Sequence, residues 1–178
     1  MDRQFLKSVV EGLIFAQPEP VSIEAMKAVL GDEPTDTIQA VLDELQQEYR
    51  HRARGFVLDK VAGGYQFRSL RSIAPWILEM KKAKPSRLSR AALEVLTIIA
   101  YNQPVTRGRI EQIRGVESAP TIKNLVEREL VMVVGRKDIP GRPLLYGTSK
   151  RFLEVFGLPD LASLPPLPES ESMTEEPS

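Results

Sequence analysis

The chain has 178 residues, of which 42% are hydrophobic and 27% charged, and its 24 basic residues equal its 24 acidic ones. This composition is typical of a globular protein that folds in water, and the length suits one ordinary domain or two small ones. The absence of cysteine excludes disulfides and thiolate metal sites, and a single histidine excludes the common structural zinc patterns.

The first predicted element is a helix near the N-terminus. Apolar residues recur at helical spacing from Leu6 to Ile14, and two prolines end the pattern soon afterwards. Lys7 and Glu11 interrupt the stripe and no small-residue cleavage site follows it, so a signal peptide is not expected. No apolar run approaches the roughly 20 residues of a membrane helix. We therefore expect a cytoplasmic protein.

Two more helices are predicted before residue 55. Ser22 is suited to cap a short second helix that stops at Gly31. Thr35 or Asp36 can cap a third helix, whose apolar positions repeat at intervals of three and four residues until Gly55. The apolar positions of the second and third helices are Met26, Val29, Leu30, Ile38, Val41, Leu42, Leu45 and Tyr49.

Two strand-like runs follow these helices. They span residues 56–61 and 65–68, and residues 62–64 (Ala-Gly-Gly) between them can take the positive φ angles of a tight hairpin turn. Three helices with a short middle one, followed by a hairpin, form the element order of a winged helix, a relative of the helix-turn-helix. The first unit is therefore predicted to be a winged-helix domain.

The same unit is predicted to occur twice, because the sequence resembles itself at an offset of 84 residues. Residues 15–22 (FAQPEPVS) align with residues 99–106 (IAYNQPVT), and Gly31 falls on Gly115 without a gap. In the second unit Thr106 caps the second helix and Ser118 opens the third. The expected helices are residues 91–101, 107–114 and the run from 119, and the expected wing strands are residues 131–134 and 144–146 around the loop 135–143.

The remaining segments connect or follow the two units. Residues 73–82 are predicted to form one more helix, and the joint is expected at residues 84–86 (Lys-Pro-Ser). A helical turn or two after the second wing should place Phe152, Val155 and Phe156 for packing.

The predicted fold is mainly α with small β wings (α+β). It consists of two tandem winged-helix domains, residues 1–84 and 85–158, and a tail, residues 159–178. The tail is rich in proline, acidic residues and serine, which leaves too little apolar surface to bury, so we expect it to be disordered.

Charge is distributed unevenly along the chain. Residues 1–80 carry nine basic and twelve acidic side chains, residues 81–151 carry fifteen and six, and residues 152–178 carry none and six. The outward face of the first domain's third helix is acidic and would be repelled by a duplex. The basic charge of the second domain has three possible explanations: a solvated surface, a contact with an acidic protein partner, or a weak contact with DNA.

No pattern of residues indicates catalysis. The only histidine, His51, lies in an arginine-rich stretch and is expected to be exposed. The glycines contain neither G-x-G-x-x-G nor G-x-x-x-x-G-K, so no nucleotide cradle is recognisable. We therefore expect no enzymatic activity, no cofactor and no metal.

Two stretches of the second unit resemble the segregation and condensation protein B (ScpB) family. They are LSRAALEVLTIIAYNQPVTR (residues 88–107) with IEQIRGV (residues 110–116), and GRKDIPGRPLLYGT (residues 135–148) with FLEVFGL (residues 152–158). The resemblance runs from about Leu6 to Leu158. Glu129 departs from it, because a glycine is expected before the leucine at that position.

This resemblance implies a homodimeric accessory subunit of the kite type. Such a subunit binds the kleisin ScpA and, through it, the ATPase SMC, in the complex that condenses and segregates chromosomes. In this family the first domain dimerises and the second engages the kleisin. The resemblance thus implies a nucleoid-associated scaffold, and the alternative is a winged-helix DNA-binding regulator that uses the basic second domain.

Partner-binding residues are expected around the second wing. The loop 135–143 has glycines and prolines that would order it, and it is either a solvated turn or a rigid contact for an acidic partner. Tyr101 is a further candidate that could equally belong to the core. The candidates are Tyr101, Arg107, Arg109, Arg136, Lys137, Asp138 and Arg142.

Overall fold

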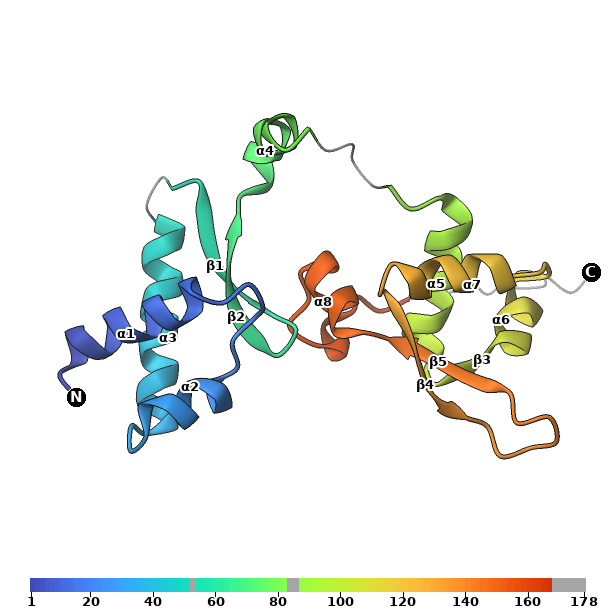
Figure 1. Cartoon of the computed structure of the whole chain (residues 1–178), viewed down its shortest axis with the longest axis horizontal. Coiled ribbons are helices and arrows are strands. Elements are labelled where there is room, and N and C mark those ends of the chain that lie inside the picture. Colours follow the sequence, from blue (N-terminus) through green and yellow to red (C-terminus); the bar gives the residue numbers. More distant parts are fainter. Residues whose placement is uncertain (52–53, 83–86, 168–178) are drawn as a thin grey trace, which may run out of the picture.

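The computed structural model describes residues 1–51, 54–82 and 87–167. Helices and short antiparallel strands form two bodies along the long axis, one from each half of the chain (Figure 1). The expected α+β class with two winged-helix-like units is confirmed. The predicted joint at residues 84–86 lies outside the described residues.

The first body contains three helices and a hairpin, in the predicted order. They are α1 (Arg3–Phe15), α2 (Ile23–Leu30), α3 (Thr35–His51), β1 (Phe56–Val61) and β2 (Gly64–Ser69). The hairpin turn needs positive φ at Ala62 and Gly63, as the sequence predicted.

Local hydrogen bonds explain where these helices begin and end. The side chain of Ser22 accepts a hydrogen bond from the Ala25 amide and caps α2, which ends at Gly31 in a positive-φ conformation. The prediction for α3 was one or two residues too late, because Thr35 and Asp36 lie inside its first turn and not at its cap.

Apolar side chains of α1, α2 and α3 meet the inner face of the hairpin. Of the stripe predicted for α1, Leu6, Val10 and Ile14 are buried. α3 contributes five buried residues. The core of this body consists of Leu6, Val10, Ile14, Met26, Leu30, Ile38, Val41, Leu42, Leu45, Tyr49, Leu58 and Tyr65.

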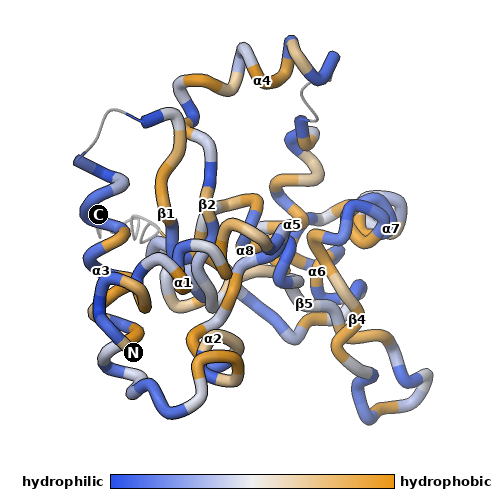
Figure 2. Tube along the Cα trace, turned by 60° about the vertical axis from the view of Figure 1, so that its left-hand side comes forward, coloured by the Kyte–Doolittle hydropathy of each residue, from blue (hydrophilic) through white to orange (hydrophobic). Residues whose placement is uncertain are grey.

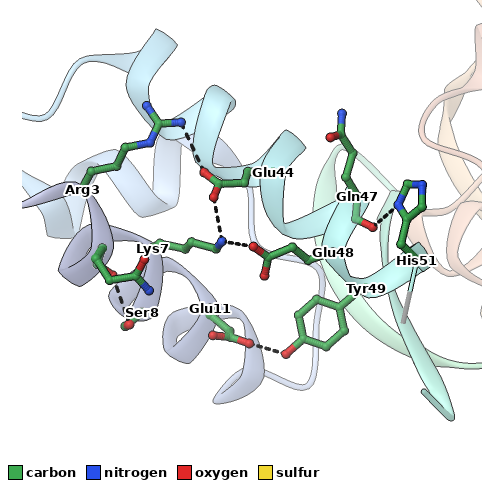
Figure 3. Close-up of polar contacts among 10 residues, drawn as sticks. Arg3, Lys7, Ser8, Glu11, Glu44, Gln47, Glu48, Tyr49 and His51 are labelled. Carbon is green, nitrogen blue, oxygen red and sulfur yellow. Dashed lines mark hydrogen bonds and ion pairs between the residues drawn. The ribbon is translucent and has the colours of Figure 1, made fainter. Parts of the chain in front are cut away.

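A polar cluster joins α1 to α3 beside this core (Figure 3). The Lys7 ammonium donates hydrogen bonds to Glu44 and Glu48, and the Tyr49 hydroxyl donates one to Glu11. Burial opposes the charged form of Lys7, but the two carboxylates outweigh it and raise the lysine pKa. The cluster sets the register of the two helices.

The connection between the two bodies begins with η1 (Arg71–Ile73) and α4 (Ala74–Met80). The helix predicted over residues 73–82 is therefore present but shorter. It stands apart from both bodies in two views (Figures 1 and 2), and it has no buried residue. Trp76 is 70% exposed and Met80 is 78% exposed.

The second body repeats the first and adds a helix at its end. Its helices are α5 (Arg90–Asn102), α6 (Arg107–Arg114), α7 (Ala119–Glu127) and α8 (Lys150–Phe156). Its core consists of Ala92, Val95, Leu96, Ile99, Ala100, Val105, Ile110, Ile122, Leu125, Leu130, Val131 and Phe152.

The wing of the second body is part of a three-stranded sheet. Its strands are β3 (Val105–Thr106), β4 (Val131–Arg136) and β5 (Leu144–Thr148), in the order β3-β5-β4. Val105 of β3 pairs with Tyr146, and Val21, at the equivalent position 84 residues earlier, pairs with Tyr65 of the first wing. The same pairing in both bodies supports the duplication.

Two predictions about the C-terminal part hold only in part, and Phe152 is buried as expected. Val155 and Phe156 remain 49% and 44% exposed, because the short α8 turns only Phe152 fully into the core. Residues 159–167 were expected to be disordered, but they contain η2 (Leu161–Ser163) and continue along the second body. The rest of the predicted tail, residues 168–178, lies outside the described residues.

Backbone hydrogen bonds also connect the two bodies. The amides of Ala62 and Gly63, at the tip of the first hairpin, donate to the carbonyls of Leu158 and Pro159 at distances of 2.9 and 2.8 Å. The first wing therefore contacts the segment that follows α8.

Candidate functional site

The predicted basic residues of α6 lie at its exposed N-terminal turn. The Thr106 side chain caps α6 by accepting a hydrogen bond from the Arg109 amide at 3.3 Å. The Arg109 guanidinium donates to Gln112 at 2.8 Å, and Arg107 lies 3.8 Å from Glu111. Both arginines are exposed, so their charges are available at the surface.

The loop of the second wing is ordered by its own backbone. The Lys137 amide donates to the Pro143 carbonyl, and the Arg142 amide donates to the Ile139 carbonyl, each at 2.9 Å. The Arg136 guanidinium donates to the Arg142 carbonyl at 3.2 Å. Arg136 at the end of β4, and Lys137 and Arg142 on the loop, are thus held in a structured but exposed part of the wing.

Two open hollows join α6 to this loop. One, of about 480 Å³, is lined by Arg107 together with Gly141 and Pro143 of the loop. The other, of about 360 Å³, is lined by Arg109 and Lys137. The hollows bring cations of α6 and of the wing loop (Arg107, Arg109 and Lys137) onto one surface. We call these three, together with Arg136 and Arg142 of the same wing, the basic wing surface.

The other two candidates lie differently. Asp138 is exposed on the same loop and places one negative charge among the cations. Tyr101 does not join the basic wing surface, because it faces α8. Its hydroxyl donates a hydrogen bond to the Pro165 carbonyl, beyond the predicted end of the second domain. From the sequence, Tyr101 was either a partner contact or a core residue. In the structure its side chain is half-buried.

Some of the charge in the basic segment is used inside the domain. The side chain of Arg114 is only 10% exposed, and it donates to Ser118 at 2.9 Å and to Glu94 at 3.2 Å. This arginine orders the turn between α6 and α7, so it adds little to a surface for partners.

Two residues that support the wing were not predicted. The side-chain oxygen Oε1 of Gln103 accepts a hydrogen bond from the Thr148 amide at 2.7 Å, which ties the end of β5 to the end of α5. A Cβ at Gly147 would lie 2.9 Å from Gln103 and from Val134, so only glycine allows this approach. Gln103 stood in the quoted family stretch, but its partner is 45 residues away.

The described residues contain neither a cluster suited to a metal ion nor a helix suited to span a membrane. Within residues 1–51, 54–82 and 87–167, no group of three or more histidine, aspartate or glutamate side chains could hold a metal ion. No helix in the same ranges is long and apolar enough to cross a membrane. His51 is exposed and its ring nitrogen lies 2.7 Å from the Gln47 carbonyl (Figure 3).

Comparison with known proteins identifies the relatives of this chain. The model of a family described as "Segregation and condensation complex subunit ScpB" matches residues 8–167. The segregation and condensation protein B of Syntrophotalea carbinolica is 49% identical over 176 residues, which are 99% of this chain and 89% of that protein.

Two further relatives cover different lengths. The segregation and condensation protein B of Myxococcus xanthus is 43% identical over 171 residues, and this chain spans about half (52%) of its length. A crystal structure of a dimer of the ScpB N-terminal domain complexed with ScpA peptide is 31% identical, with a TM-score of 0.40. The match covers 43% of this chain and 95% of that one.

Proposed function

We propose that this chain, which belongs to the ScpB family of segregation and condensation complex subunits, is a non-catalytic, dimeric scaffold. It binds the kleisin ScpA and, through ScpA, the ATPase SMC, and so takes part in chromosome condensation and segregation in the cytoplasm. The observation that carries this proposal is the family match over residues 8–167. The scaffold needs no cofactor.

The two domains have separate roles in this proposal. The first domain, residues 1–84, dimerises, and the second engages the kleisin. We extend the second domain from residue 158 to residue 167, because Leu164 packs against its core. The exposed apolar side chains of Trp76 and Met80 support a protein contact near the end of the first domain.

The basic wing surface is the proposed kleisin contact in the second domain. An ordered loop loses little conformational entropy on binding, and its cations suit an acidic segment of the partner. The competing function, DNA binding, draws on the same cations. It is less favoured because the first domain presents an acidic α3, where Asp36 and Asp43 are exposed and a duplex would be repelled.

The mass of the purified protein in solution tests the proposal. Light scattering should give twice the chain mass of 19.9 kDa for the protein alone. Addition of ScpA from the same source should give a larger species that contains both proteins. A monomer that takes up no ScpA, but binds duplex DNA with an affinity that falls steeply with salt, would favour the DNA-binding function instead.

A further inference from the structure

An apolar groove lies between α5 and α8, away from the basic wing surface. Its volume is about 450 Å³, and its walls are mainly aliphatic and aromatic. Leu93 and Tyr101 of α5 form one side, and Phe152 and Phe156 of α8 form the other. The two phenylalanine rings lie 4.8 Å apart between centroids. The groove thus offers rings and a hydroxyl donor together.

The chain's own segment 164–167 (Leu-Pro-Pro-Leu) runs along this groove and forms part of its wall. Leu164 is half-buried against the second core and has an extended backbone, with φ −63° and ψ 136°, as expected before a proline. The Tyr101 hydroxyl donates its hydrogen bond to the Pro165 carbonyl. We call these four residues the strap.

The arrangement has the physical features of polyproline recognition. Proline-rich segments favour an extended left-handed helix with free carbonyls, and they dock into grooves lined by aromatic side chains. Because such a segment is ordered before it binds, it loses little entropy on docking. Here the strap supplies two adjacent prolines flanked by leucines, and the groove supplies Tyr101, Phe152 and Phe156.

The strap fills the groove only in part. Leu167 at its end is 56% exposed, and Leu93 and Phe156 in the walls are 45% and 44% exposed. Leu164 is the only strap residue that is not exposed, and the hydrogen bond from the Tyr101 hydroxyl adds to its packing. A segment of the same kind with more contacts can therefore displace it.

We propose that the groove between α5 and α8 is a binding site for a polyproline-type segment of a partner protein, with leucines on either side of its prolines. The strap occupies this site in cis and competes with the partner. The site goes beyond the kleisin contact on the basic wing surface, since it shares no residue with that surface and depends on apolar and aromatic contacts.

A labelled peptide tests this site in the full chain. The probe is a fluorescent peptide with the sequence of residues 159–167 (PDLASLPPL), and the protein carries Leu164→Asp and Leu167→Asp, which expel the strap. Fluorescence anisotropy should show saturable binding to this variant. Binding to the wild-type chain should be at least about tenfold weaker, since a tethered strap acts at an effective concentration in the millimolar range.

Matched controls distinguish peptide binding in the groove from non-specific peptide binding. Leu161→Asp changes an exposed leucine that does not line the groove, so it should bind the peptide as weakly as the wild type. Tyr101→Phe in the strap variant should weaken binding several-fold. A peptide with both strap leucines replaced by aspartate should not bind.

Two results would overturn the proposal. The first is a strap variant with native circular dichroism that binds the peptide no better than the wild-type chain does. If that variant does not fold, amide chemical shifts of the wild-type chain with millimolar peptide decide the question. Shifts confined to α5 and α8 support the site, and unchanged shifts in both helices refute it.

Discussion

The ammonium nitrogen of Lys7 in α1 lies 2.8 Å from a carboxylate oxygen of Glu44 in α3. The lysine side chain is only 9% exposed, whereas Glu44 and its neighbour Glu48 are 40% and 38% exposed. The buried cation therefore has two partners that remain partly hydrated. This relationship fixes α1 on α3 beside the core of the first domain.

Replacing Lys7 by methionine should destabilise the first domain. Methionine keeps most of the apolar stem but removes both hydrogen bonds, so we expect a loss of about 1 to 2 kcal/mol in the free energy of unfolding. Arg3→Met is the matched control, because Arg3 contacts the same Glu44 but is 64% exposed. Its effect should stay within about 0.5 kcal/mol in urea unfolding. Equal losses for both variants would contradict a special role for Lys7.

The same cluster predicts a pH dependence of stability. The hydrogen bonds from Lys7 and then Arg3 lower the pKa of Glu44 below its ordinary value of 4.5. As the pH falls, the unfolded chain binds this proton first, so stability present above pH 4.5 is lost as the pH approaches the lower folded pKa. Urea unfolding between about pH 6 and pH 3 should show a smaller acid loss for Glu44→Gln than for the wild type. The exposed Glu79→Gln should retain the wild-type slope.

Glu129 has a backbone conformation that favours glycine. Its φ is +58°, its amide donates to the Val126 carbonyl at 2.9 Å, and its carbonyl accepts a hydrogen bond from Ser149. Glu129→Gly should raise the free energy of unfolding by roughly 0.5 to 1 kcal/mol, because it relieves a left-handed conformation. Lys123→Gly, inside α7, should lower it by about 1 kcal/mol. Thermal unfolding of the two variants should therefore shift in opposite directions.

This strain also explains why the resemblance to the family predicted a glycine at position 129. Many boundaries in the fold followed from the sequence for similarly local reasons. Ser22, Thr106 and Gly31 act on amides and dihedral angles within a few residues, so their roles were visible without any tertiary contact. The pairing of Val21 with the first wing, repeated by Val105 with the second wing, could not be seen in the sequence. Each partner lies about 40 residues away, in a wing strand.

Features of the site that depend on local sequence could be predicted, whereas contacts between elements distant in the sequence could not. Glycines and prolines indicated an ordered loop between the wing strands, and the structure has one. The prediction missed that Arg114 is used internally, because its partner Glu94 lies on the preceding helix. It also missed the strap, since four residues in a tail rich in proline, acidic residues and serine show no apolar periodicity, and the strap packs on a groove that α5 and α8 form together.

The basic wing surface predicts a charge-dependent affinity for ScpA. Lys137→Glu with Arg142→Glu reverses two exposed cations, so we expect an affinity at least about tenfold lower at low salt and a weaker salt dependence. Lys123→Glu is the control, because this exposed lysine of α7 does not line the hollows that join α6 to the wing. Titration calorimetry at two salt concentrations measures both effects. Equal losses for the wing variant and the control would place the contact elsewhere.

Two truncations separate the ordered and acidic parts of the C-terminal segment. Removal of residues 159–178 deletes the Pro159 carbonyl that bonds Gly63 and exposes the groove beside Phe152, so it should lower stability by at least about 2 kcal/mol. Removal of residues 168–178 keeps these contacts and should change stability by less than about 0.5 kcal/mol. The shorter deletion still removes four glutamates. If they screen the basic wing surface, it should raise low-salt binding to duplex DNA, and unchanged binding would refute that screening.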